Sequence, residues 1–371
     1  MAAWRSWLYA LIVPVLAVVT ALAIGGVIIA LTGGNVAKAY QGLWEGSFGQ
    51  PRSLSNTLVR TTPYIFGGLA VALAFKGGLF NIGVEGQITM GSLATAFVGY
   101  AVTGVPFPFH LILAILAGFL VGGLWGAIPG FLKAYTGAHE VIVTIMLNYV
   151  AINIASYLLG GPMKDHNPAV AIAQTAPVLQ SARLPPLLPD PQYRVHWGVV
   201  LGVLAAIGVW WLLQKTTLGF EIRTVGANPN AARYAGISVG RTIVILMALS
   251  GGLAGLAGGL DVVGLNYYYA AAFTAGYGFD SIAVALLGHS NPFGVLPSAL
   301  LFGGLASGSA RMQFLSQIPI DIIQVVQALI LIFVAAPTMI RWLYRLRLPR
   351  EAERAATGDV QFGASWGKAE T

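Results

Sequence analysis

The sequence predicts an all-α protein that crosses a membrane about ten times. Hydrophobic residues make up 57% of the 371 residues and charged residues only 9%, whereas soluble domains carry roughly 25% charged residues. The mean hydropathy is +0.76. Several apolar runs reach the roughly 20 residues that a helix needs to cross the hydrocarbon layer. A membrane β-barrel would show short alternating segments instead.

Apolar stretches between polar breaks place the spans. The run after Arg5 is too long for the core of a cleaved signal peptide, so it is the expected first span. The expected spans cover residues 7–31, 61–75, 82–103, 108–132, 140–160, 196–213, 242–264, 274–289, 293–311 and 319–340. Thr61–Phe75 is short, and Phe273–His289 carries glycines and Asp280. Because polar or broken backbone at membrane depth survives only inside protein or beside a cavity, we expect these two to be pore-side or re-entrant.

The distribution of basic residues predicts the orientation. With the N-terminus in the cytoplasm, thirteen of the 20 Lys and Arg side chains fall inside and seven outside, which follows the positive-inside rule. Both termini and the loop 214–241 are then cytoplasmic, and the loop 161–195 is outside. We expect 1–350 to form one transmembrane domain and 351–371 a flexible cytoplasmic tail. The proline-rich outer loop is either a docking surface for an external partner or a stiff spacer.

The polar break Lys215–Arg241 carries the signals of a short helix. Asn228 is a good N-cap because its side chain can accept the free amides of a first turn. Pro229 suits that turn, and Gly236 can end the helix in the left-handed conformation. A short ordered helix between two spans is a candidate docking element. The alternative is a solvated basic loop that only obeys the positive-inside rule.

Glycines recur every four residues in two of the spans. One set is Gly118, Gly122, Gly126 and Gly130, and the other is Gly251, Gly255 and Gly259. Lipid provides no hydrophobic drive between helices, so small faces that let backbones approach hold such bundles together. We expect these glycines to be helix seams.

Five polar side chains within the spans are candidates for a translocation path: Asn81, Glu85, Glu140, Asn148 and Asp280. Asn81 and Glu85 are four residues apart, and Glu140 and Asn148 are eight apart, so each pair shares a helix face. An ionisable residue in a span usually faces a bundle interior or a cavity. The alternative is that these side chains cap helix starts, where exposed amides favour carboxylates.

No motif points to catalysis or to a metal. A phosphate-binding loop, a His-Glu-x-x-His zinc motif and a dinucleotide fingerprint are all missing, and the chain has five scattered His and no Cys. We therefore expect no enzyme activity and no metal or cofactor in this chain. Nucleic-acid binding is also not expected despite the pI of 9.6, because the basic charge is distributed by membrane side.

Four sequence blocks resemble the permease subunits of bacterial ATP-binding-cassette (ABC) importers for simple sugars and nucleosides, within the branched-chain/ribose-type permease superfamily. The blocks are GGLFNIGVEGQ (Gly77–Gln87), GAHEVIVTIMLNY (Gly137–Tyr149), LGFEIRTVGANPNAARYAGI (Leu218–Ile237) and GYGFDSIAVALLGHSNPFG (Gly276–Gly294). The resemblance runs from about residue 50 to 345. The second block favours the longer permease of guanosine/BMP-type nucleoside importers over ribose-type permeases. The sequence departs from that pattern at Val143, where a polar residue, often Asn, is expected.

The resemblance implies a role and partners. The chain would form the translocation path for a nucleoside or a related sugar-like solute by alternating access, in the bacterial cytoplasmic membrane. It would pair with a second, shorter permease as a heterodimer, with cytoplasmic ABC ATPases that bind ATP and Mg, and with an external substrate-binding lipoprotein. The helix after Asn228 would be the coupling helix. The residues on or near the ATPase contact would be Glu221, Arg223, Gly226, Asn228, Ala232, Arg233, Tyr234 and Gly236.

Two rival classes stay open on the residues alone. One is an ion-coupled secondary transporter or channel without an ATPase, in which the intramembrane acids would relay protons or cations. The other is a membrane scaffold that transports nothing and uses the cytoplasmic loop to anchor a partner.

Overall fold

The described chain is built from helices. The computed structural model describes residues 3–167, 170–270 and 276–345, and no strand occurs within these ranges. The helices are α1 (Ala3–Leu31), α2 (Val36–Ser47), α3 (Pro51–Lys76), α4 (Val84–Ala101), α5 (Phe109–Thr136), α6 (Glu140–Gly160), α7 (Gly198–Lys215), α8 (Thr217–Ala227), α9 (Pro229–Tyr234), α10 (Val239–Asp261), α11 (Tyr277–Leu287), α12 (Pro292–Ser316), α13 (Asp321–Ala335) and α14 (Pro337–Leu343), with the short turns η1 (Gln180–Ala182) and η2 (Val262–Asn266). The all-α membrane fold is confirmed.

Seven helices of the described part are long and apolar enough to cross a membrane. They are α1 from Ile12, α3, α5, α6, α7, α10 with η2, and α12. The count of ten is not confirmed, because α4 carries Glu85 and Gln87 and α11 has only 11 residues. The expected span over 319–340 is broken into two helices. Helices α13 and α14 meet at 91°, because Pro337 disfavours the helical conformation of the residue before it.

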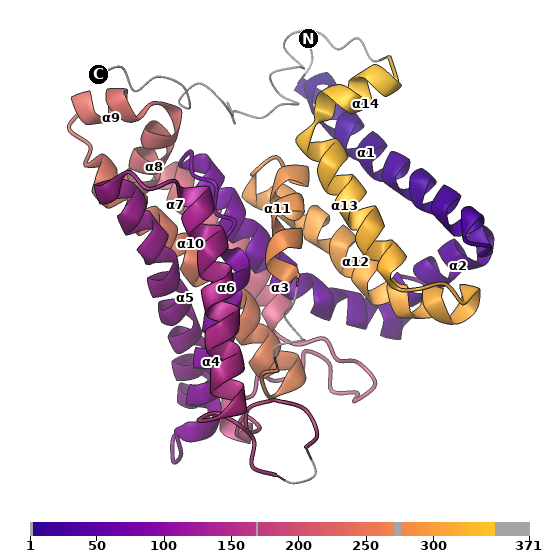
Figure 1. The fold of residues 1–371 in the computed structure, drawn as a ribbon, viewed down its shortest axis with the longest axis horizontal. Coiled ribbons are helices and arrows are strands. Elements are labelled where there is room, and N and C mark those ends of the chain that lie inside the picture. Colours follow the sequence, from indigo (N-terminus) through magenta and orange to yellow (C-terminus); the bar gives the residue numbers. More distant parts are fainter. Residues whose placement is uncertain (1–2, 168–169, 271–275, 346–371) are drawn as a thin grey trace.

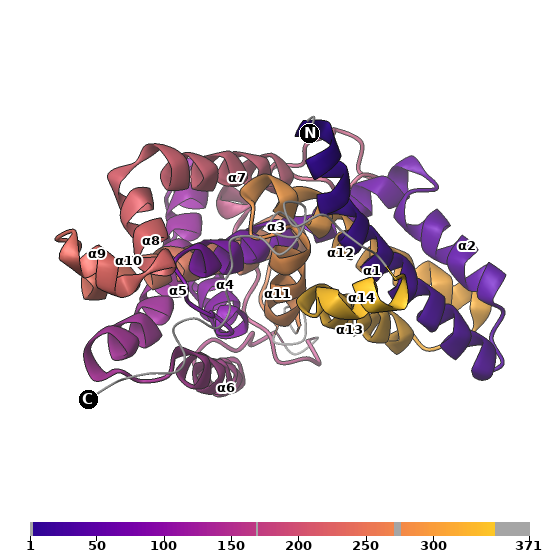
Figure 2. The ribbon, with the colours of Figure 1, turned by 90° about the horizontal axis from the view of Figure 1, so that it is seen from above.

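Helix α3 is the axis of the bundle. Figure 2 shows it crossing the centre, with α5, α8 and α10 toward one side and α1, α12 and α13 toward the other. The expectation of a short span at 61–75 is wrong, since α3 begins at Pro51. The polar start was missed because Thr57 and Thr61 donate their hydroxyls to main-chain carbonyls, Thr57 to Ser47 and Thr61 to Thr57, both at 2.8 Å. Arg60 therefore lies within the span and not in an outer loop.

Helix α2 occupies part of the expected first outer loop. The side chain of Asn35 caps it. Its glycines pack directly against α12. If Gly42 carried a Cβ atom, that atom would lie only 2.9 Å from the Arg311 carbonyl oxygen. Glu45 also forms an ion pair with Arg311 at 3.3 Å. Helix α2 thus lies along α12. It contains no long apolar run, so the hydropathy pattern does not predict it.

The glycine seams are confirmed for α5 and α10. A Cβ at Gly122 would lie 2.5 Å from the Gly251 oxygen, and one at Gly255 would lie 2.2 Å from the Gly118 oxygen. The two backbones therefore touch directly. Gly259 faces a different helix, with Thr95 of α4 at 2.6 Å from its added Cβ.

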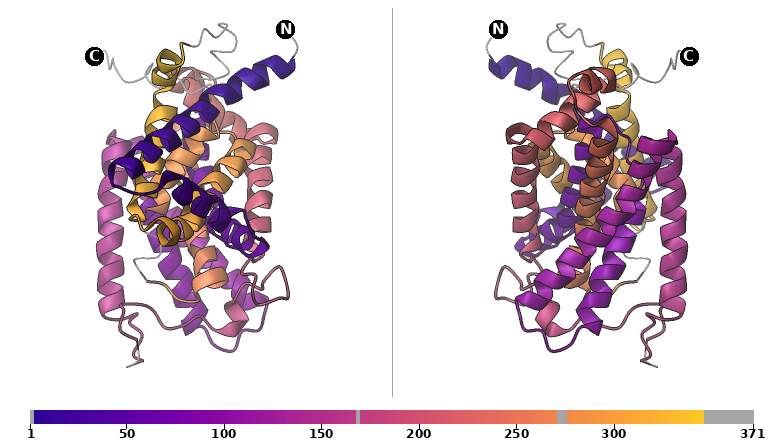
Figure 3. Two further views of the ribbon diagram at one scale, coloured as in Figure 1. Left: turned by 90° about the vertical axis from the view of Figure 1, so that its right-hand side faces the viewer. Right: turned by 90° about the vertical axis from the view of Figure 1, so that its left-hand side faces the viewer.

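The bundle has two distinct ends. The start of α1, the α8–α9 pair and α14 lie at one end, and the loop between α6 and α7 lies at the other (Figure 1). This agrees with the expectation that the N-terminal end and the loop 214–241 share one side. Helices α6 and α7 stand on opposite flanks of the bundle (Figure 3). The expected tail 351–371 lies outside the described residues.

Candidate functional site

The break between α7 and α10 folds into two helices. The predicted start of α9 is confirmed: the Asn228 side chain accepts the backbone amides of Asn230 and Ala231 at 3.0 and 3.1 Å. Gly236 follows the helix with φ +80°. Helix α8 was not predicted, although Thr216 caps it by accepting the Gly219 amide at 3.0 Å. The segment is therefore an ordered helical pair.

The eight residues expected near an ATPase contact divide into two groups. Glu221, Gly226 and Ala232 face the bundle: Glu221 accepts the Thr242 hydroxyl at 3.3 Å, and Ala232 is fully buried. The exposed group is Arg223, Asn228, Arg233, Tyr234 and Gly236. Tyr234 is 94% exposed. The exposed group forms a surface, and the bundle-facing group holds the helical pair against the bundle.

Gly226 lies against the end of α3. A Cβ there would be 2.3 Å from the Lys76 carbonyl oxygen and 2.8 Å from the Gly77 carbonyl carbon. Gly78 has φ +72°, and its own added Cβ would lie 3.1 Å from the Gly226 Cα. A left-handed residue without a Cβ is what such a close turn requires. Helix α8 thus touches the α3–α4 junction backbone to backbone, a contact that the sequence did not indicate.

The α3–α4 junction is held by Asn81. Its amide donates to Gln87 Oε1 at 3.0 Å and to Ser250 Oγ at 2.9 Å. Its side-chain oxygen accepts the Gly83 amide at 3.0 Å. Ser250 in turn donates to the Ala70 carbonyl at 2.7 Å. The non-helical junction is therefore fixed to α3, α4 and α10 by buried hydrogen bonds.

Asn148 and Glu85 both act at helix starts. Asn148, on α6, accepts the Gly86 amide at 2.8 Å and donates to the Ile82 carbonyl at 2.9 Å. Glu85 accepts the amides of Gly276 and Gly278 at 2.9 and 2.7 Å. Asn148 thus caps α4, and Glu85 caps the start of α11 rather than that of its own helix. The structure brings these two together with Asn81, and their hydrogen bonds fit the capping alternative.

Glu140 lies apart from that cluster, whereas Asp280 follows the Glu85-bound amide of Gly278 by two residues and lies close enough for the two charges to interact. Glu140 is buried at the α5–α6 turn, where Lys133 Nζ is 3.0 Å from its carboxylate. Asp280, on α11, accepts the Tyr64 hydroxyl at 3.0 Å. Of the five predicted path residues, Asn81, Glu85 and Asn148 therefore meet around the start of α4, Asp280 adjoins Glu85 at the start of α11, and Glu140 is separate.

Backbone hydrogen bonds join the outer loop to the segment 267–269, which follows η2. The amide of Val178 donates to the Tyr267 carbonyl at 2.7 Å, and that of Thr175 donates to the Tyr269 carbonyl at 3.0 Å. Arg183 lies over the Tyr267 ring at 4.4 Å. The proline-rich loop thus packs on the bundle along this stretch.

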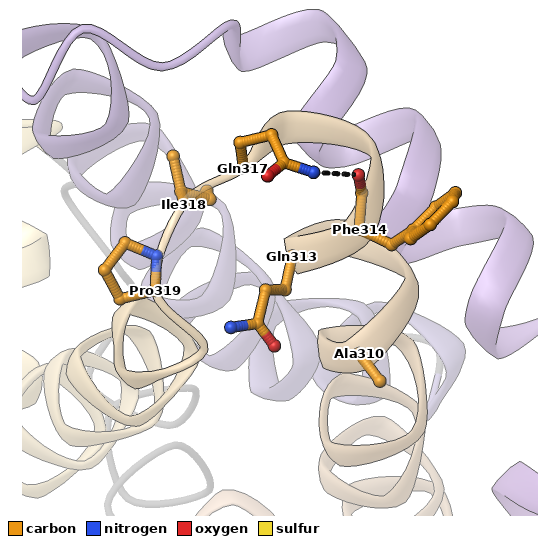
Figure 4. A pocket seen from close by; sticks show the side chains of 6 residues that line it. All are labelled: Ala310, Gln313, Phe314, Gln317, Ile318 and Pro319. Atoms are coloured by element: carbon orange, nitrogen blue, oxygen red, sulfur yellow. Dashed lines mark hydrogen bonds between the residues drawn. The ribbon is translucent and has the colours of Figure 1, made fainter.

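A cavity of about 600 Å³ opens at the end of α12. Figure 4 shows its lining, with Gln317 Nε2 donating to the Phe314 carbonyl at 2.9 Å. The lining residues are Ala310, Gln313, Phe314, Gln317, Ile318 and Pro319. None of the predicted site residues lines it. Within the described ranges, no group of three His, Asp or Glu side chains is arranged to hold a metal ion.

Similar proteins are transport permeases. The guanosine ABC transporter permease protein NupP of Bacillus subtilis is 44% identical over 335 residues, 90% of this chain and 95% of that protein. The glucose ABC transporter permease protein TsgB13 of Haloferax volcanii is 36% identical over 86% of each chain. The nucleoside ABC transporter permease protein NupB of Lactococcus lactis is 33% identical over 91% of this chain and 93% of that protein.

Bacillus subtilis and Lactococcus lactis each also have a second similar permease. The guanosine permease protein NupQ of B. subtilis is 28% identical, and the nucleoside permease protein NupC of L. lactis is 27% identical. Residues 53–335 of this chain match the family described as "Branched-chain amino acid transport system / permease component". Since that match covers most of the chain, from α3 to α13, this multi-pass membrane protein belongs to that family of permease components.

Proposed function

We propose that the chain is a nucleoside permease subunit of an ABC importer and forms the translocation path by alternating access. The observation that carries the proposal is the exposed tyrosine on a short, capped helix. Tyr234 is 94% exposed on α9, whereas Ala232, two residues earlier, is fully buried. A large aromatic side chain fixed on an ordered surface is typical of a protein contact. Helix α9 is therefore the coupling helix, seated in a cleft of a cytoplasmic ABC ATPase.

Motion at α9 would reach the membrane through α8. Helix α8 contacts Gly77 and Gly78 through Gly226, and that junction continues into Asn81 and Glu85. Glu85 holds the start of α11 by two backbone amides. Packed elements transmit discrete rearrangements because closely packed interfaces do not deform continuously. A tilt of α8 would therefore change the angle between α3, α4 and α11.

The solute is proposed to be a nucleoside or a related sugar-like compound. The support is the similarity to NupP and NupB, which are named as guanosine and nucleoside permeases. TsgB13 is named as a glucose permease, so sugars are the nearest alternative. A neutral solute needs hydrogen bonds along its path, and polar side chains within spans supply them.

In the bacterial cytoplasmic membrane, the chain would work with three partners. A second, shorter permease would complete a heterodimer, as the paired permeases of B. subtilis and L. lactis suggest. A cytoplasmic ATPase would bind ATP and Mg and perform all catalysis, so this chain is not an enzyme. An external binding lipoprotein would deliver the solute to the outer loop 161–195. Both termini would be cytoplasmic, and 1–350 would be the permease domain.

The test is uptake by the purified complex in proteoliposomes. Radiolabelled guanosine is supplied with the binding protein outside, and ATP is enclosed inside. We expect uptake that requires hydrolysable ATP and persists when an uncoupler removes ion gradients. Uptake that collapses with the uncoupler while ATP remains would instead establish an ion-coupled transporter.

A further inference from the structure

Arg60 is an exposed charge on the most buried span. It lies in α3, where its neighbours Val59 and Thr61 are each 3% exposed, yet Arg60 itself is exposed. Sixteen residues separate it from Lys76 at the other end of the helix, which is about 24 Å at 1.5 Å per residue. The hydrocarbon layer is about 30 Å thick. With Lys76 at the inner boundary, Arg60 lies at hydrocarbon depth.

Arg60 faces other polar side chains. It lies close enough to Asp261 for their charges to interact, and within hydrogen-bonding reach of the Tyr277 hydroxyl. Asp261 also accepts Asn266 Nδ2 at 2.7 Å. An arginine at this depth that faced lipid would extend toward the headgroups. Arg60 instead lies beside Asp261 at the end of α10 and Tyr277 at the start of α11, so its exposed surface adjoins polar groups of the bundle.

Two further groups complete this cluster on α3 and α11. Asp280 accepts the Tyr64 hydroxyl at 3.0 Å. The rings of Tyr64 and Tyr277 meet edge to face with centroids 5.2 Å apart. One guanidinium, two carboxylates and two tyrosines thus gather here. Asp261 and Tyr64 are buried, whereas Arg60 is exposed and Tyr277 and Asp280 are partly exposed.

We propose that Arg60, Tyr277 and Asp280 form a binding site for the ribose hydroxyls of a neutral nucleoside on its way through the permease. This inference rests on the proposed function and adds the chemistry that recognises the solute. A guanidinium only donates hydrogen bonds and a carboxylate only accepts them, so a vicinal diol satisfies both at once. A phosphorylated nucleotide is disfavoured because the cluster holds two carboxylates, Asp261 and Asp280, and a single guanidinium.

The experiment measures guanosine uptake by the complete reconstituted complex, with ATP inside and saturating binding protein outside. The variants are Arg60→Gln, Arg60→Lys and Asp280→Asn. Arg52→Gln is the matched control, because Arg52 is an exposed arginine in the first turn of the same helix. ATP hydrolysis stimulated by the loaded binding protein and the amount of co-purified second permease are measured in parallel.

We expect Arg60→Gln and Asp280→Asn each to lower guanosine uptake roughly tenfold or more, in line with a lost hydrogen bond to a charged group. Stimulated ATP hydrolysis and subunit recovery stay within about twofold of the parent, and Arg60→Lys retains part of the uptake. Arg52→Gln transports like the parent. Unchanged uptake in Arg60→Gln overturns the site. Loss of the second permease from that variant also overturns it and makes Arg60 a subunit contact. Absence of ATP-dependent uptake in the parent complex is a failure of the proposed function itself.

Discussion

Replacing Gly226 with alanine should uncouple ATP hydrolysis from transport. The added methyl group would lie 2.3 Å from the Lys76 oxygen and 2.8 Å from the Gly77 carbonyl carbon, both backbone atoms. Ordinary contacts of a Cβ lie at 3.4–4 Å. Helix α8 would have to move away from the α3–α4 junction by about 1 Å, because no flexible side chain is available to give way.

The expected magnitude follows from the cost of overpacking, which is about 1–3 kcal/mol. Such an energy changes an equilibrium between two conformations by roughly 5–150-fold. The contact joins the helices α8 and α9 to the membrane helices. We therefore expect the added methyl group to weaken the coupling between movement of α8–α9 and movement of the membrane helices. The ratio of guanosine transported to ATP hydrolysed should fall at least fivefold.

The assay measures both rates on the same proteoliposomes. Gly208→Ala is the matched control, because Gly208 lies in α7 and an added Cβ would meet nothing within 4 Å. An alanine there removes the helix penalty of glycine, about 0.5–1 kcal/mol, and should leave the ratio unchanged. If Gly226→Ala transported with the parent ratio, or if Gly208→Ala lost coupling equally, transmission through the Gly226 contact would be refuted.

Three other substitutions test the remaining parts of the account. Tyr234→Ala should leave the thermal stability of the permease unchanged, because the side chain is 94% exposed, but should reduce the ATPase recovered by affinity purification; full recovery would contradict a coupling role. Glu85→Gln should destabilise the bundle by about 1–3 kcal/mol, since one amide oxygen replaces a carboxylate that accepts two amides; an unchanged midpoint of thermal unfolding in detergent would argue against the cap. Gly255→Ala should lower that midpoint too, because its Cβ would lie 2.2 Å from the Gly118 oxygen; a midpoint equal to the parent's would exclude the seam as a main source of stability.

The sequence identified the features that depend on neighbouring residues. The cap at Asn228 and the glycine after α9 are local signals, and α9 forms where they predict it. The span 140–160 has the predicted bounds because its polar ends are sharp. The glycines at every fourth residue of α5 predicted the contact with α10, because two helix backbones can approach closely only where small residues recur along one face.

The features that depend on tertiary contacts were missed or left open. Helix α2 is stabilised by its packing on α12. In the first half of α3, the threonine hydroxyls donate hydrogen bonds to backbone carbonyls. Apolar-run length detects neither arrangement, so the predicted span begins only at Thr61 and leaves Arg60 in a loop. Glu85 is near a helix start, but which helix it caps became visible only once α4 and α11 were brought together.

The most direct measurement concerns the side of the membrane that α9 faces and what covers it. The chain contains no cysteine, so Tyr234→Cys provides a single labelling site. In intact right-side-out vesicles, a membrane-impermeant maleimide should leave this site unmodified. It should label the site after the membrane is opened, and the assembled ATPase should protect it. Labelling from outside in intact vesicles, or labelling that the ATPase does not change, would contradict the account.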